Sequence, residues 1–282
     1  MSLLDHTRVG LSAAVRRRIA GPDFEGAHRR IFDAPGPRWF SAADPIWRVH
    51  ADASMFVGGI RALLLQSLHP RAMAAVSQHS GFRGDPWGRL QRTSAFLATT
   101  TYGSIPAAER MITAVNRIHA GIEGVTADGV PYRADEPTLL AWVHVAEVDS
   151  FLAAHDHFGA HPLSDRERDQ YLEQTARIAR RLGVSDPPTT AHALGAQLDG
   201  YRAELRMTDE AREAADLLLH RPPLSLIEQV GYRSMAAGAI SILPTWARLE
   251  LELPTLPITE RLVTRPVTRT TLRGLRWAMA PA

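Results

Sequence analysis

One histidine in the middle of an apolar stretch is the first residue of this sequence that could carry chemistry. Residues 138–158 have apolar side chains at helical spacing, and His144 falls on the same face as Val148, Phe151 and Leu152. A neutral imidazole in that position can ligate a metal ion. A hydrogen-bonded core histidine is the commoner occupant of such a face, so this helix alone leaves both interpretations open.

Two arginines and a threonine form a second candidate group. Asp85 and the proline after it predict the cap and the first residue of a helix. Arg89, Arg92 and Thr93 then share a face of that helix with Phe96. The two guanidinium groups are either solvated at the surface or directed at an anion such as a carboxylate, which their planar fork fits.

A pair of glycines indicates a close approach to the backbone of a third segment. Asp44 and Pro45 predict the start of a helix that is apolar almost all round and ends before Pro70. Such a helix is expected at the centre of the protein. Gly58 and Gly59 in its middle leave room either for a neighbouring helix, which is the commoner case, or for a flat cofactor.

The elements that must position these groups are also predicted to be helices. Asp135 is a candidate cap for the helix that carries His144, and further helices are expected at residues 71–79, after Ser104, at 164–182 and within 194–243. The strand signal is confined to a small hairpin around Asp128 and Gly129. We therefore predict an all-α protein with a single helical domain at residues 44–250. A helical arm at 1–43 precedes that domain, and an arginine-rich extension at 251–282 follows it.

Composition excludes several classes of protein. The 282 residues are 45% hydrophobic and 22% charged, which is ordinary for a soluble globular chain. All 32 basic residues are arginine and the net charge is only +2, with no basic cluster that alternates with aromatic residues, so nucleic-acid binding is not expected. Cysteine is absent, so a bound metal would need histidine or carboxylate ligands.

Nothing in the sequence predicts export or membrane insertion. Arg16, Arg17 and Arg18 are not followed by an apolar run, and no segment has the length of a transmembrane helix, so we expect a cytoplasmic protein. The arginine-rich C-terminal segment could form an amphipathic helix that lies on a membrane, although a solvated helix is commoner. The sequence does not indicate an oligomeric state.

Common catalytic motifs are absent: the sequence has no GxSxG elbow, no phosphate-binding loop, no HExxH and no dinucleotide fingerprint. A buried histidine, two aligned arginines and much apolar lining are instead compatible with a haem pocket. The same features suit a non-catalytic helical protein that carries haem or a lipid.

Three runs resemble a known family. LLLQSLHP (63–70), HSGFRGDPWGRLQRT (79–93) and WVHVAEVDSFLAA (142–154) are similar to segments of the DUF2236 family, which joins the latex-clearing rubber oxygenases to the MpaB oxygenases. The resemblance covers roughly residues 44–250. It implies a globin-related helical core that holds one haem b and activates O2 at the iron.

The resemblance also implies roles for particular residues. His144 matches the proximal iron ligand, and Arg89 and Thr93 match the distal arginine and threonine. Together with Arg92 they are the predicted catalytic residues, which either orient bound dioxygen by hydrogen bonds or anchor a carboxylate of the substrate or of haem. Arg92 stands where the rubber oxygenases have a lysine; a guanidinium stays protonated and donates hydrogen bonds, whereas a deprotonated lysine can ligate iron. We expect the cofactor to lie against four further residues, Gly58, Gly59, Phe96 and Val148. The predicted function is a haem b-dependent oxygenase that acts with O2 on an apolar, unsaturated small molecule.

Overall fold

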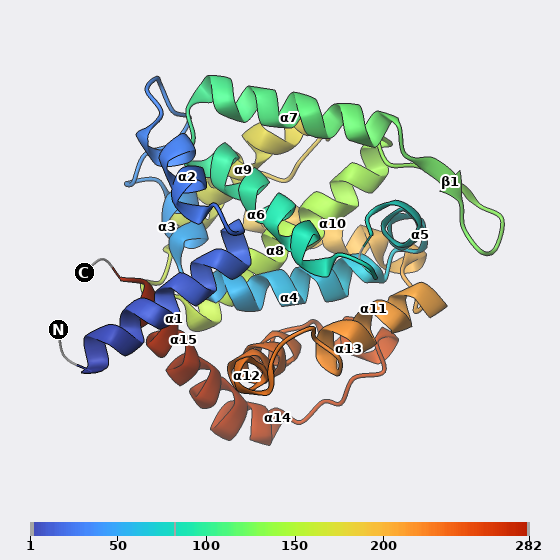
Figure 1. Ribbon diagram of the computed structural model, residues 1–282. Coiled ribbons are helices and arrows are strands. Elements are labelled where there is room, and N and C mark those ends of the chain that lie inside the picture. Colours follow the sequence, from blue (N-terminus) through green and yellow to red (C-terminus); the bar gives the residue numbers. More distant parts are fainter. Residues whose placement is uncertain (1–2, 82, 281–282) are drawn as a thin grey trace.

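Helices make up most of the computed structural model, which describes residues 3–81 and 83–280 (Figure 1). The predicted all-α class is confirmed, while the relation of the core to globins stays a prediction. The helices are α1 (Leu3–Ala20), α2 (Phe24–His28), α3 (Pro45–Ala51), α4 (Ser54–Ser67), α5 (Pro70–His79), α6 (Pro86–Tyr102), α7 (Ile105–Ala120), α8 (Pro137–Phe158), α9 (Asp165–Leu182), α10 (Ala191–Gly200), α11 (Asp209–Leu219), α12 (Leu226–Ser241), α13 (Thr245–Glu250), α14 (Pro257–Thr259) and α15 (Arg265–Met279), with π-helical turns η1 (Arg29–Asp33) and η3 (Glu260–Thr264) and a 3-10 turn η2 (Tyr201–Glu204).

The centre of the molecule is the contact between α4 and α8, which is the most extensive helix pairing in the described residues (Figure 1). Both helices are lined by buried aliphatic and aromatic side chains of the main core. A buried guanidinium joins them: Arg61 of α4 donates to Asp149 at 2.6 Å and to Ser150 at 2.8 Å, and also to the carbonyl of Ile242 at 3.1 Å. These bonds satisfy a charge that would be costly if left unpaired in the core.

The prediction of one continuous helix over residues 44–69 was wrong. The chain turns out of helical geometry at Asp52 (φ −82°, ψ 145°), which separates α3 from α4. The Asp52 carboxylate accepts a bond from the amide of Ser54 at 2.8 Å and two bonds from the Arg276 guanidinium at 2.7 and 2.9 Å. Arg276 also donates to the carbonyl of Phe158 at 2.5 Å. The break is therefore held by residues far away in the sequence.

Several predicted helix ends are confirmed. Asp85 caps α6 by accepting a bond from the amide of Gly88 at 2.8 Å. Ser164 and Glu167 form the predicted capping box of α9, and Gly183 ends that helix with φ at +102°, a conformation that favours glycine. The predicted cap of α8 was one residue off, because Glu136 rather than its neighbour occupies the N-cap position.

The predicted hairpin is also confirmed. Strands β1 (Glu123–Val125) and β2 (Pro131–Arg133) pair antiparallel, and Gly129 in the turn has φ at +83°. They are the only paired strands in the described part of the chain.

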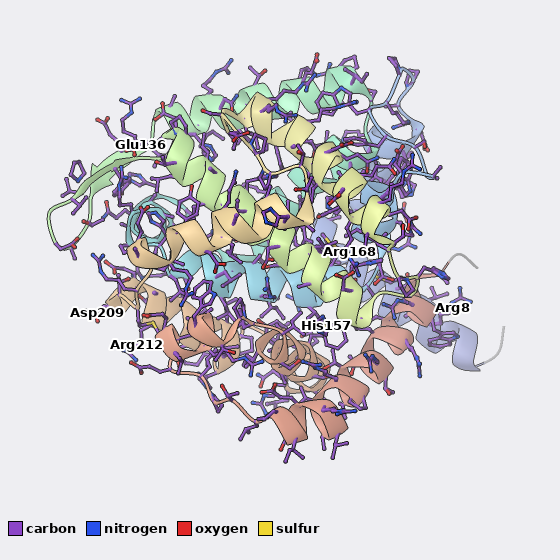
Figure 2. All side chains as sticks on the ribbon, turned by 180° about the vertical axis from the view of Figure 1, so that it is seen from behind. Arg8, Glu136, His157, Arg168, Asp209 and Arg212 are labelled. Atoms are coloured by element: carbon purple, nitrogen blue, oxygen red, sulfur yellow. The ribbon has the colours of Figure 1, made fainter. Side chains whose placement is uncertain are left out.

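The C-terminal helices pack closely on the rest of the molecule. A Cβ atom added at Gly238 of α12 would lie 2.6 Å from the Thr268 side chain, so only glycine permits this crossing of α12 and α15. Arg269 of α15 donates to the carbonyl of His157. Figure 2 labels His157, near the end of α8. The proposed division of the chain near residues 43 and 250 stays a prediction. No helix in the described residues combines the length and the apolar character needed to span a bilayer.

Candidate functional site

His144 lies near the middle of α8 with its ring largely enclosed. Its Nε2 atom is buried and has no hydrogen-bond partner in the described residues. Burial lowers the pKa of His144 to about 4, because the charged form is poorly solvated there. The imidazole is therefore neutral at pH 7, with an uncommitted nitrogen, which is the form that ligates metal ions.

A half-buried carboxyl lies one helical turn from this imidazole. Glu147 is three residues after His144, which puts the two side chains on the same face of α8. Burial raises the pKa of Glu147 to about 7. No hydrogen bond or ion pair joins its side chain to another described residue. Burial, and then the charge of Glu147, raises the pKa of the Tyr171 hydroxyl on α9, so the carboxyl and the phenol influence each other.

A hydrogen-bonded group connects three further helices beside α8. His50 of α3 places Nδ1 2.8 Å from the hydroxyl of Thr101 on α6 and Nε2 3.3 Å from the hydroxyl of Tyr171 on α9. Its ring meets the edge of Phe151, with the ring centroids 5.6 Å apart. Burial lowers the pKa of His50 to about 3, so this imidazole is also neutral at pH 7. Thr101 and Tyr171 are fully buried.

The two glycines of α4 have different surroundings. A Cβ atom at Gly58 would lie 2.9 Å from the Phe151 ring and 3.2 Å from the carbonyl of Ser150, so this glycine permits the close packing of α4 on α8. A Cβ atom at Gly59 would meet no atom within 4 Å. Helix packing accounts for the first glycine, and the second leaves space beside the backbone.

The predicted polar group on α6 is divided between two environments. Arg89 is half-buried and donates to the hydroxyl of Ser80 at 3.0 Å; burial, and then the charge of Arg92, lowers its pKa. Arg92 is exposed and lies 3.4 Å from the carboxylate of Asp85. Thr93 is also exposed, and its hydroxyl donates to the carbonyl of Arg89 at 3.1 Å. No hydrogen bond or ion pair in the described residues joins this group to His144.

The two apolar residues expected at the site belong to the main core. Val148 of α8 is buried, and Phe96 of α6 is partly buried against the same core. Both helices thus contribute apolar side chains to the same core. In the described residues, no three histidine or acidic side chains are close enough together to form a metal site, and this includes the histidines at 155, 157 and 161.

Residues 47–279 match the family described as the catalytic domain of the ER-bound oxygenases mpaB/B′ and the rubber oxygenase. The chain belongs to this family. The matched range runs from α3 to the end of α15, and therefore includes every residue of the site described above. No curated protein and no solved structure matches the chain. The family resemblance expected from the three sequence runs is confirmed, and the chain carries an oxygenase catalytic domain.

Sequence reasoning missed three polar residues of this mpaB/rubber oxygenase domain: His50, Glu147 and Tyr171. The available signal for Glu147 was a carboxylate within an apolar helix, three residues after a candidate ligand. His50 and Tyr171 are 121 residues apart, and only tertiary packing brings their side chains together.

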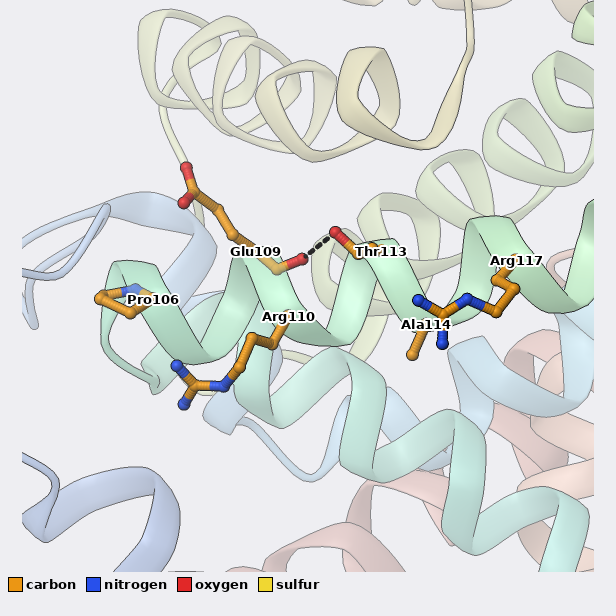
Figure 3. A pocket seen from close by; sticks show the side chains of 6 residues that line it. All are labelled: Pro106, Glu109, Arg110, Thr113, Ala114 and Arg117. Atoms are coloured by element: carbon orange, nitrogen blue, oxygen red, sulfur yellow. Dashed lines mark hydrogen bonds between the residues drawn. The ribbon is translucent and has the colours of Figure 1, made fainter.

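A hollow elsewhere on this oxygenase domain is separate from the site. Its lining side chains project from one exposed side of α7 (Figure 3) and include none of the residues predicted for the site. They are Pro106, Glu109, Arg110, Thr113, Ala114 and Arg117.

Proposed function

We propose that this protein is a haem b-dependent oxygenase that acts with O2 on an apolar, unsaturated small molecule. The observation that carries the proposal is the neutral imidazole of His144, whose buried Nε2 has no partner in the described residues. A histidine nitrogen of this kind is a common axial ligand of haem iron. Membership of an oxygenase family supports the reaction class.

The residues expected at the cofactor suit a flat, largely apolar group. His144 would hold the iron, Val148 and Phe96 would supply apolar contacts, and Gly59 leaves backbone space that any side chain would reduce. His50, His144 and Glu147 are enclosed enough for burial to shift their pKa values, yet each keeps some accessible surface. We infer that these side chains border an interior space. Bound haem would supply the iron centre at which O2 becomes reactive towards a carbon–carbon double bond.

The arginines of α6 suit the binding of a carboxylate. Arg89 keeps its positive charge despite burial, because a guanidinium does not deprotonate in proteins. Arg92 and Thr93 lie on the exposed side of the same helix, a position that favours a carboxylate near the surface over a ligand deep in the core. We therefore assign the group to anchoring a carboxylate of the cofactor or of the substrate.

The carboxyl of Glu147 can exchange a proton near neutral pH, because its pKa is about 7. Tyr171 and His50 extend this polar environment towards α6 through the hydroxyl of Thr101. Their bonds fix the orientation of the His50 ring. We propose that Glu147 holds the exchangeable proton of the site and that the other three residues keep its surroundings polar.

The test begins with the absorption spectrum of the protein purified with haem. We expect a Soret band in the parent protein and its loss in His144→Ala, with the helical circular dichroism spectrum unchanged. His155→Gln is the matched control, since His155 is also a buried imidazole of α8 without a hydrogen-bond partner in the described residues but has almost no accessible surface. That variant should retain haem.

Two outcomes would contradict the proposal. Full haem occupancy with an unchanged spectrum in His144→Ala would show that the iron ligand is another residue. A haem-loaded protein that consumes no O2 with unsaturated terpenoids or lipids, in the presence of a reductant, would instead indicate a haem carrier.

A further inference from the structure

The outer face of α12 and α15 exposes large apolar side chains. Leu226 and Val230 of α12 are 82% and 74% exposed, and Val263, Val267 and Trp277 along η3 and α15 are 54%, 50% and 47% exposed. Scattered exposed apolar residues are normal on a protein surface, whereas a contiguous group of them indicates a contact surface. The question is therefore whether these five residues lie together.

The packing of the two helices answers this question. Arg265 donates to the carbonyl of Ser241, and Thr268 donates to the carbonyl of Ser234, so residue numbers rise along α15 as they fall along α12. The helices are therefore antiparallel, and they pack against each other.

The exposed residues stand at equivalent positions on this pair. The row of α12 that meets α15 includes Gly231 and Gly238, and the facing row of α15 includes Thr268 and Thr271. Val230 directly precedes Gly231, and Val267 directly precedes Thr268. Each valine is therefore rotated by about 100° about its helix axis from the residue that contacts the other helix. Because the two helices are antiparallel, this rotation directs both valine side chains to the same side of the pair. Leu226 lies one turn before Val230, and Val263 lies one turn before Val267. Trp277 is ten residues after Val267, so it lies about 80° further round α15, at the edge of this surface, where the Arg8 guanidinium is 6.0 Å from its ring centroid. We call this surface the α12–α15 face.

Positive charge accompanies the apolar residues. Residues 253–280 contain five arginines and one acid, Glu260, whose carboxylate is bound by Arg248 at 2.6 Å. Arg261 and Arg273 are exposed and form no ion pair in the described residues. The elements η3 and α15, which carry part of the face, therefore also expose two guanidinium groups that have no acidic partner in the described residues.

We propose that the α12–α15 face docks on an anionic lipid surface. Apolar side chains that project from surface helices enter the boundary between headgroups and acyl chains, and arginines bind lipid phosphates beside them. Tryptophan favours this boundary because its ring is apolar and its N–H is polar. A second copy of the chain fits less well, because face-to-face stacking would bring the arginines of both copies together. The proposal does not depend on the binding of haem.

The experiment is sedimentation of the full chain with vesicles. We expect the protein to sediment with vesicles of phosphatidylcholine and phosphatidylglycerol in equal parts and to remain in solution with vesicles of phosphatidylcholine alone. Binding should weaken when salt is raised from about 0.1 M to about 1 M, because salt screens the arginine contribution. Equal binding to both kinds of vesicle, or binding to neither, would overturn the proposal.

Surface substitutions locate the contact. Arg261→Gln with Arg273→Gln should reduce the partition coefficient by about fivefold for each arginine removed. Val230→Gln with Val267→Gln should reduce it by about tenfold or more, since these side chains would enter the lipid. The matched control is Arg117→Gln with Ile118→Gln on α7, which removes one exposed arginine and one apolar residue that is 61% exposed.

Unchanged binding in either α12–α15 variant, or an equal loss in the control, would overturn the assignment. A dimer in analytical ultracentrifugation that the valine substitutions dissociate, without vesicle binding by the parent, would assign the face to self-association.

Discussion

At the scale of single residues, burial moves the pKa values of His144 and Glu147 in opposite directions. The first falls to about 4 and the second rises to about 7, so burial makes both groups mainly neutral in mildly acidic solution. Neither side chain has an oppositely charged partner in the described residues. Such unpaired groups cost stability, and proteins retain them mostly at functional sites.

The raised pKa of Glu147 predicts that the free energy of unfolding depends on pH. Its pKa is about 7 in the folded protein against the ordinary value of 4.5, so the folded state holds this proton more tightly than the unfolded state. The free energy of unfolding should therefore fall as the pH rises from 4.5 to 7, by about 3 kcal/mol from this group. Glu147→Gln removes the effect and should be more stable than the parent at pH 8, with little difference at pH 4.5.

Urea unfolding of parent and variant at several pH values measures this difference. The control substitution is Glu109→Gln, which replaces an exposed carboxylate on α7. A constant difference between Glu147→Gln and the parent across the pH range would contradict the prediction.

The two arginines of α6 should contribute unequally to cofactor affinity. Arg89→Met removes a half-buried guanidinium and should weaken haem binding by about 1.5 to 3 kcal/mol, as expected for a bond to a charged group. Arg92→Gln should cost less than about 1 kcal/mol, because Arg92 is exposed and lies beside Asp85. Haem titration followed by Soret absorbance gives both values. Larger losses for Arg92 than for Arg89 would argue against the carboxylate assignment.

At the scale of the elements, the adjacent glycines of α4 make a matched pair. Gly58→Ala should lower the free energy of unfolding by about 1 to 3 kcal/mol, because its Cβ would press against Phe151 and the backbone of α8. The Cβ atom of Gly59→Ala would meet no atom within 4 Å. This substitution should therefore raise the free energy of unfolding by about 0.5 to 1 kcal/mol through helix propensity alone. Thermal unfolding without haem tests both values.

The second half of this test requires the cofactor. If haem lies against α4, Gly59→Ala should weaken its binding although the variant is more stable. A haem affinity equal to that of the parent would place the cofactor away from Gly59.

Local sequence rules predicted most elements but not their junctions. The cap at Asp85, the capping box at Ser164 and the left-handed glycine after α9 each depend on a few neighbouring residues, so their signals are visible in the sequence. The break at Asp52 combines a local bond from the Ser54 amide with two bonds from Arg276, which is 224 residues away. The hydrogen bonds of His50 depend similarly on packing between helices, and no local pattern contains this information.

The candidate site was predictable to a similar extent. His144 stood out because a single imidazole interrupts an apolar face. Its Nε2 atom is buried, as expected for an inward-facing residue, while its role as a ligand stays a prediction. The different exposures of Arg89 and Arg92 could not be read from spacing, because both residues fall on one side of α6 and the position of α5 determines which is covered.

At the scale of the whole molecule, removal of the C-terminal helices would show whether the domain ends near residue 250. Leu272 of α15 is fully buried in the main core, and the matched family range extends to residue 279. A chain that ends at residue 250 should lose at least about 3 kcal/mol of stability, the order of magnitude for removing one buried leucine. Circular dichroism melting curves provide the measurement. An unchanged melting temperature would support residues 251–282 as a separate extension.

The break between α3 and α4 at Asp52 has a consequence for the order in which contacts form during folding. Arg276 lies 224 residues after Asp52 and 118 residues after Phe158, so its bonds to the Asp52 carboxylate and to the Phe158 carbonyl close long loops. Contacts that close such long loops form late in folding. Arg276→Gln should therefore accelerate unfolding and leave the refolding rate nearly unchanged. The two arms of a chevron plot give the refolding and unfolding rates separately. Slower refolding of Arg276→Gln would show that the contact between Arg276 and Asp52 belongs to the folding nucleus.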